Sequence, residues 1–279
     1  MEAFQIAGKI TKGLLLAALL AGCQNDQITT PSDVTSTVNN NQNAKMSAEV
    51  FLVKDGENSL QYLKFGKFAG KLWKVIDTYS YTEYTYDDSS GDLWITSKKY
   101  AKSNNKLANH KTYHIVNGRC VASKDLTSKF AYEYKYNVQG SLIEIKRYFG
   151  AHVLTQQFSY KAILPNTQRL DKITYIGESG PFMEYKFSYS AFQDKYFLNP
   201  YHTQLDKYLR IFGTFSDKLV QDVITDYLDG TASSSNYIYT LNADGYVTTR
   251  TDTYYPNIYE PTFDVLTDSL SYVTAWPGL

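Results

Sequence analysis

The stretch that decides the fold is Tyr132-Glu-Tyr-Lys-Tyr136-Asn-Val-Gln-Gly140-Ser-Leu142-Ile-Glu-Ile-Lys146. Before the glycine, tyrosines alternate with charged residues, which is the period of a strand with one buried and one solvent-facing side. Asn-Val-Gln-Gly interrupts the alternation, and glycine supplies the backbone freedom that a tight turn needs. The alternation resumes at Leu142. The stretch therefore predicts a β-hairpin.

Similar hairpins recur along the chain, at residues 84–95, 113–121 and 237–247. Further strands are predicted at residues 60–65, 72–76, 157–160, 170–176, 183–189 and 222–228. The 26 tyrosines also favour sheet, because a tyrosine ring suits a pleated, half-buried surface. We expect an all-β fold, an antiparallel meander of β-hairpin repeats that forms a curved sheet, an open barrel or a sandwich.

One segment, residues 203–212, has a helical pattern instead. Leu205, Leu209 and Phe212 recur at i, i+4 and i+7, and Gly213 provides a stop. The sequence therefore predicts one short helix, which would cover an end or an edge of the sheet and shield its open backbone groups.

The first 22 residues have the features of an export signal. Lys9 and Lys12 precede an apolar run, residues 13–22, that is shorter than the roughly 20 residues needed to cross a bilayer as a helix. The run ends in Leu20-Ala-Gly-Cys23, which resembles the lipobox of bacterial lipoproteins. The resemblance implies lipid attachment at Cys23, with acyl chains such as palmitate, and cleavage just before it. We predict a lipoprotein signal peptide over 1–22, a flexible polar tether over 23–47 and a β-hairpin repeat domain over 48–279.

Charge and cysteine content narrow the function classes. Without residues 1–22 the chain has 26 basic and 27 acidic residues, a net charge near −1 with no basic stretch, which argues against nucleic-acid binding. After lipid attachment at Cys23, Cys120 is the one remaining cysteine, so no internal disulfide forms. Cys120 lies in a predicted strand, and we expect a buried, inert thiol.

The hairpins also resemble a known repeat. Residues 134–142 resemble the tyrosine–aspartate (YD) repeat of RHS-type proteins, with Asn137 in the aspartate position. Residues 239–247 match the same frame with Leu241 replacing the second tyrosine, and residues 84–91 keep Tyr86-Asp87 but have one extra residue before the glycine.

A further segment extends this resemblance. Residues 189–201 contain Asp194-Lys195 and Asn199-Pro200-Tyr201, and are similar to a stretch in YD-repeat-like lipoproteins of Bacteroidota. The resemblance implies a hairpin-repeat lipoprotein of the outer membrane, facing either the periplasm or the cell surface. The family's function is unassigned, so no catalytic residue carries over.

Metal and cofactor sites are not predicted. His110 and His114 would lie on one strand face about 13 Å apart, which is too far for one ion. His152 and His202 have no ligand partner at a suitable spacing. The acids at positions 87, 88 and 92 lack the spacing of a calcium loop and suit a turn better.

Cross-strand packing is the commoner use of aromatic residues at hairpin positions, and ligand binding is the second use. Trp73, Trp94 and Trp276 are weak candidates for ligand contact, because large rings stack on sugars or anchor protein partners. We predict a non-enzymatic, membrane-tethered module that binds a glycan or an envelope protein. The alternative is an exported glycan hydrolase, which needs two carboxylates across a cleft. A closed barrel around a small apolar ligand is a third alternative.

Overall fold

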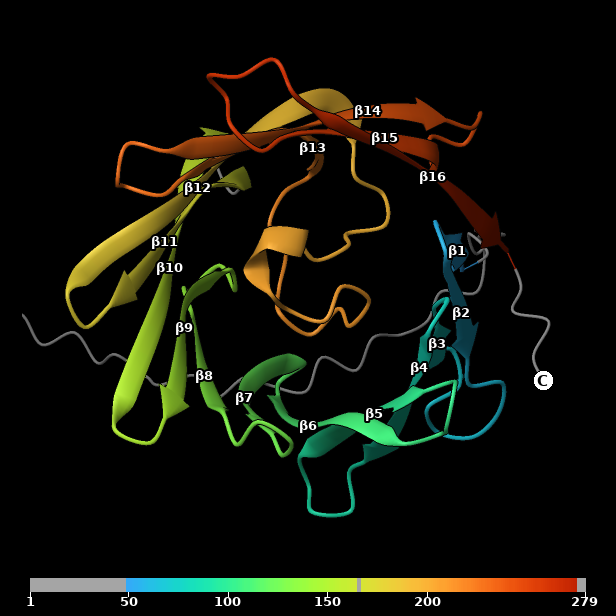
Figure 1. Ribbon diagram of the computed structural model, residues 1–279. Helices are drawn as coiled ribbons and strands as arrows, with labels where there is room; N and C mark the ends of the chain where they lie inside the picture. The colour runs from blue at the N-terminus through green and yellow to red at the C-terminus, as the bar shows by residue number, and fades with distance from the viewer. Residues whose placement is uncertain (1–48, 165–166, 275–279) are drawn as a thin grey trace, which may run out of the picture. The chain divides into compact units, whose positions relative to one another are not determined.

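The computed structural model describes residues 49–164 and 167–274 (Figure 1). In this part of the chain, sixteen antiparallel strands close into one barrel, in which each strand pairs with its neighbours in sequence and β16 pairs with β1. The strands are β1 (Phe51–Asp55), β2 (Asn58–Tyr62), β3 (Leu72–Ile76), β4 (Ser80–Asp87), β5 (Leu93–Ala101), β6 (Leu107–Val116), β7 (Arg119–Asp125), β8 (Ala131–Tyr136), β9 (Leu142–Phe149), β10 (His152–Leu164), β11 (Thr167–Gly177), β12 (Gly180–Gln193), β13 (Lys218–Asp226), β14 (Ala232–Leu241), β15 (Val247–Tyr255) and β16 (Asp264–Val273).

The all-β prediction is confirmed, and the four predicted hairpins are β4/β5, β6/β7, β8/β9 and β14/β15. The expectation of an open sheet or a sandwich is wrong, because the pairing Leu52↔Tyr272 and Asp55↔Leu270 joins the first strand to the last. Closure removes both free edges, whose unpaired N–H and C=O groups would otherwise be exposed.

Tyrosine hydroxyls form hydrogen bonds between neighbouring strands on the inner face. Near one end of the barrel, a tyrosine of an even-numbered strand donates to a backbone carbonyl of the preceding strand. The pairs are Tyr62–Leu52 (2.7 Å), Tyr86–Leu72 (2.7 Å), Tyr136–Cys120 (2.7 Å), Tyr160–Leu142 (2.9 Å), Tyr189–Leu170 (2.6 Å) and Tyr239–Val220 (2.6 Å). The acceptors lie at or beside register irregularities, where a carbonyl is free of the regular ladder. The abundance of tyrosine therefore has a repeated structural use.

Two of the turns in these hairpins have the same hydrogen bonds. Asn137 Oδ1 accepts from the Ser141 N–H, and Asn242 Oδ1 accepts from the Tyr246 N–H. In both turns the glycine N–H donates to the asparagine carbonyl, and Gly140 (φ 82°) and Gly245 (φ 79°) have the left-handed conformation. The asparagine and the glycine together therefore fix the turn.

The segment between β12 and β13, residues 194–217, lies inside the ring of strands (Figure 1) and is called the plug below. Its aromatic side chains pack on the wall, and its backbone pairs with the wall directly: the Cys120 N–H donates to the Ile211 carbonyl (2.8 Å) and the Leu170 N–H to the Phe215 carbonyl (2.7 Å). The predicted helix over 203–212 is wrong. The structure has only a three-residue 3-10 turn, Tyr201–Thr203, because the wall takes hydrogen bonds that a helix would make internally.

The outer face of the wall carries ion pairs between neighbouring strands together with exposed apolar side chains such as Ile224 and Ile238. Lys74 and Glu83 form an ion pair (2.8 Å) across β3 and β4, while the adjacent Val75 and Tyr84 are buried and point inward. Similar outer pairs are Lys135–Glu144 (2.8 Å), Lys172–Glu184 (2.7 Å) and Lys186–Asp226 (3.0 Å). Residues 49–164 and 167–274 contain no helix that is long and apolar enough to cross a membrane.

Candidate functional site

A cavity of about 690 Å³ lies between the plug and strands β12–β16. It is elongated along the strands: Phe197 and Lys218 line it near one end of the barrel, and Tyr227 and Tyr254 near the other. The volume lies within the range of roughly 300–1,000 Å³ that is typical of small-molecule sites. Its lining combines many aromatic rings with a small set of polar and charged groups.

Small inward side chains on two strands border the cavity. Thr225 on β13 and Ser233 and Ser235 on β14 point into the lumen and line it. On the opposite side, Phe212 of the plug packs against Tyr113 (ring centroids 6.2 Å apart) and Tyr134 (5.3 Å). Large rings fill the lumen there, whereas the serines leave space.

Aromatic rings form much of the cavity wall. Tyr237 and Tyr239 are stacked, with centroids 6.4 Å apart, and Tyr185 contacts the His202 ring at 4.9 Å. Burial lowers the pKa of His202 to about 4, so its imidazole is neutral at physiological pH. These rings supply apolar faces, while the tyrosine hydroxyls and the imidazole nitrogens supply polar edges.

The cavity reaches the surface at the end of the barrel that carries the turns after odd-numbered strands. Tyr201 of the plug is 84% exposed and Leu266 on β16 is 63% exposed, and both line the cavity. Tyr227 and Tyr254 complete this rim. A ligand therefore meets exposed aromatic side chains before it meets the buried polar groups.

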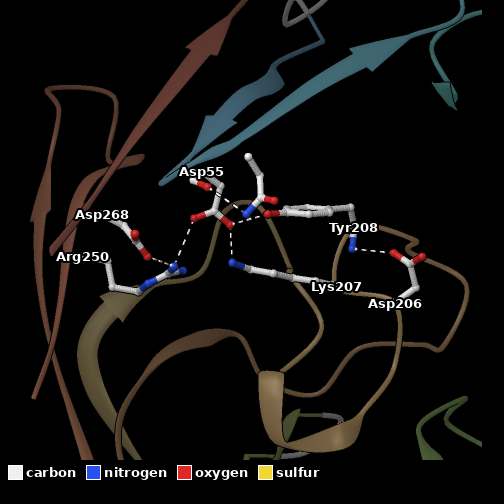
Figure 2. A network of polar contacts seen from close by, with 7 residues as sticks. Asp55, Asp206, Lys207, Tyr208, Arg250 and Asp268 are labelled. Atoms are coloured by element: carbon white, nitrogen blue, oxygen red, sulfur yellow. Dashed lines mark hydrogen bonds and ion pairs between the residues drawn. The ribbon is translucent and has the colours of Figure 1, made fainter. Parts of the chain in front are cut away.

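A buried ionic network holds the plug beside the cavity (Figure 2). Asp55, whose side chain is fully buried, pairs with Lys207 of the plug and with Arg250 of β15 (Nη2 to Oδ1, 3.1 Å), and Tyr208 donates to it (3.0 Å). Burial raises the pKa of Asp55, but the charges of Lys207 and Arg250 and the hydrogen bonds outweigh this, so the pKa lies below its usual value. Asp55 is therefore ionised and fixes the plug to β1 and β15.

The three carboxylates that line the cavity have different partners. Asp268 pairs with Arg250, and Asp194 accepts hydrogen bonds from the N–H groups of Tyr196 (3.0 Å) and Phe197 (2.8 Å). Asp252 makes no ion pair among the described residues, and its Oδ1 is buried without a hydrogen-bond partner there. Asp252 is thus the carboxylate that the protein leaves incompletely satisfied.

No protein-family model matches the sequence, and no curated protein matches it. Two solved structures are similar in fold. One is a porin-like protein from Bacteroides uniformis, 18% identical, with a TM-score of 0.43, covering 80% of this chain and 96% of its own. The other is a porin-like protein from Bacteroides vulgatus, 12% identical, with a TM-score of 0.48, covering 81% of this chain and 99% of its own.

The residues predicted to contact lipid or ligand lie away from the cavity or outside the described residues. Cys23 and Trp276 fall outside the described residues. Trp73, half-buried on β3, lies beside Lys74, whose Nζ is 5.7 Å from the Trp73 ring centroid. Trp94 is 40% exposed on β5 and stacks on His114 at 4.4 Å. Neither Trp73 nor Trp94 lines the cavity.

The other sequence candidates each have local partners. His114 Nε2 lies 2.8 Å from Asp92 Oδ2, and Asp87 accepts from the Ser89 N–H (2.9 Å) within its turn. His152 pairs with Glu178. Within the described residues, no three His, Cys, Asp or Glu side chains are grouped so that they could hold a metal ion.

Cys120 is buried, as predicted, and its Sγ donates to the Ala122 carbonyl (3.3 Å). Burial raises the pKa of the thiol, so the reactive thiolate is disfavoured. Asp55, Arg250 and Asp252 were not predicted as site residues, because a single charge at an alternating position looks like any solvent-facing strand residue. The run Ser233-Ser-Ser235, which leaves inward positions small, is the local signal that marks the cavity.

Proposed function

We propose that this protein is a non-enzymatic binding module, tethered to the outer membrane by lipid at Cys23, whose ligand occupies the lumenal cavity. The observation that carries the proposal is the elongated cavity of about 690 Å³ with aromatic walls and inward polar groups. Aromatic faces with polar edges suit a ligand that has both apolar faces and hydrogen-bonding edges.

A short oligosaccharide is the ligand class that fits this lining best. A sugar ring presents C–H groups on its faces and hydroxyls at its rim, and the cavity offers tyrosine rings beside serine, threonine and aspartate side chains. The elongated form of the cavity gives room for more than one ring along the strands. The aromatic rim at Tyr201 and Tyr254 provides a first contact for an entering chain.

The ion pairs on the outer wall support the location. A barrel that spans a bilayer shows an apolar band about 25 Å tall to the lipid, with charges strongly disfavoured at mid-depth. Here Lys74–Glu83 and Lys172–Glu184 face outward from the strands. We therefore infer that the barrel wall stands in water and that the acyl chains on Cys23 provide the membrane attachment.

A second candidate, a glycan hydrolase, is favoured by one observation. Asp252 and Asp268 lie on neighbouring strands and both line the cavity. Burial raises the pKa of Asp252, and Asp268 forms an ion pair with Arg250. Two carboxyl groups that face one cavity are the groups that a glycosidase needs.

An array of host and bacterial glycans tests both candidates when binding and turnover are measured in the same wells. We expect saturable binding without cleavage by the purified full chain. Tyr237→Ala, in the cavity, should abolish binding, while Trp73→Ala and Trp94→Ala, on the wall, should preserve it. Cleavage that Asp252→Asn and Asp268→Asn both remove would establish the hydrolase. Absence of both signals would overturn glycan recognition, and a pull-down from native membranes would then seek a protein partner.

A further inference from the structure

Most charged groups around the cavity have a polar partner, and Lys218 donates to the Ala191 carbonyl (2.6 Å). Lys207 binds Asp55, and Arg250 binds both Asp55 and Asp268, so both cations are already neutralised by carboxylates. The Asp194 carboxylate is satisfied by two backbone N–H groups. The cavity therefore has no free cation among these groups to balance another acid.

Asp252 is the exception. It occupies an inward position on β15, opposite Tyr237 of β14 and Leu266 of β16. Its Oδ1 is buried and has no partner among the described residues. Burial raises its pKa, the Ser235 hydroxyl and the Arg250 charge lower it, and Asp268 raises it again. A carboxylate with an unsatisfied buried oxygen is costly unless a ligand completes it.

Aromatic rings surround the same part of the cavity. Tyr237 and Tyr254 come from the wall, Tyr185 comes from β12, and Tyr201 comes from the plug. A cation over a tyrosine face is attracted by the ring's electron density, and the attraction is stronger where water is excluded. Aromatic rings around an unpaired carboxylate are a combination that favours an organic cation over a neutral or anionic ligand.

We propose that the cavity selects a ligand with a protonated amino group, which Asp252 binds through its carboxylate. This inference rests on the proposed function, and within the oligosaccharide class it names sugars with a free amine at carbon 2. An N-acetyl group at carbon 2 has no positive charge. A hydroxyl at carbon 2 is a neutral hydrogen-bond donor.

Titration calorimetry on the full chain in detergent tests the proposal with three sets of oligosaccharides of equal length, made of glucosamine, N-acetylglucosamine or glucose. These differ at carbon 2 alone. We expect the glucosamine series to bind at least tenfold more tightly than the other two. Asp252→Asn should remove this preference. Asp226→Asn, which alters an outward carboxylate paired with Lys186, should leave it unchanged.

Each outcome separates this inference from the proposed function. Equal affinity of the wild-type protein for all three series would overturn amine selection and leave glycan binding intact. Binding of choline, lost in Asp252→Asn, together with no oligosaccharide binding would support cation recognition and overturn the glycan class. A preference for glucosamine that survives in a folded Asp252→Asn variant would overturn the role of this carboxylate.

Discussion

The two halves of the barrel lumen differ although one repeated hairpin builds both. Against β4–β11 the plug is in direct contact with the wall: Phe212 packs on Tyr113 and Tyr134, and Phe215 packs on Phe158 at 6.1 Å. Against β12–β16 the plug contacts the wall at some points, such as His202 with Tyr185 and Tyr196 with Tyr272, and the two enclose the cavity between them. One strand topology therefore accommodates both a packed region and an open region of the lumen.

Fixed anchors keep the plug from closing the cavity. The backbone bonds from Cys120 and Leu170 hold it to the packed half, and the Lys207–Asp55 pair holds it to β1. Moving the plug toward β14 would break these interactions and leave buried polar groups unpaired, which costs more than an open cavity that water can enter. These anchors therefore hold the plug away from β14.

The largest expected contrast is in stability. Phe212→Ala removes a ring that is 1% exposed in the packed half, and should lower the free energy of unfolding by about 3 to 5 kcal/mol. Tyr237→Ala removes a ring that borders open space, so its cost should be markedly smaller. Urea denaturation of both variants measures the difference. Equal losses would mean that the two halves are packed alike.

Breaking the anchor should be almost as costly. Asp55→Asn removes the negative charge that balances the buried charges of Lys207 and Arg250. It should lower the free energy of unfolding by about 3 to 5 kcal/mol at neutral pH. The folded-state pKa of Asp55 lies below its ordinary value of 3.8. Its ionised form therefore contributes stability above the unfolded pKa, and this is lost as the pH falls through the folded pKa. Between pH 7 and pH 3, the free energy of unfolding of the wild-type protein should fall, and the Asp55→Asn variant should lack this fall.

One tyrosine of the wall gives a smaller effect. Tyr136→Phe removes the hydroxyl that donates to the Cys120 carbonyl at 2.7 Å, and should cost about 1 kcal/mol. Tyr148→Phe is the matched control, because its hydroxyl contacts Glu133 on the exposed outer face. A thermal shift of the same size in both variants would show that the inner hydrogen bond adds nothing.

The smallest effect on stability is expected at Asp206, an acid of the plug. Asp206 is buried and accepts from the Tyr84 hydroxyl (2.7 Å), and burial raises its pKa. The stability it contributes is present when it is protonated, below the unfolded pKa, and is lost as the pH rises through the folded pKa. Asp206→Asn should therefore leave stability at neutral pH unchanged or raise it by up to about 1 kcal/mol. A clear loss would show that the ionised form is required.

The local pattern predicts the hairpins because each depends on neighbouring residues. The alternation of Tyr132–Tyr136 and the Asn137…Gly140 turn determine β8/β9 within a few residues. Closure depends on β1 pairing with β16, at opposite ends of the described chain, and no local pattern encodes that register. Leu205, Leu209 and Phe212 matched a helical period, but they are buried in the lumen around an irregular chain, which periodicity alone does not distinguish.

The candidate site was less predictable for the same reason. The size of a tryptophan ring made it a candidate for ligand contact. The cavity is instead lined by tyrosines, and the sequence does not distinguish these from the tyrosines that only bond neighbouring strands together. Asp252 acquires its importance from Ser235 and Asp268 on adjacent strands, and those neighbours are known only once the register is known.

The most direct test of the lumenal site is to fill the cavity and measure affinity for the glycan that the array identifies. Ser235→Phe places a ring in the cavity, while Ser234→Phe, one residue away, places it on the opposite face of β14. We predict that Ser235→Phe abolishes binding and that Ser234→Phe binds like the wild-type protein, with both folded by circular dichroism. Unchanged affinity in Ser235→Phe would contradict a ligand site in the barrel lumen.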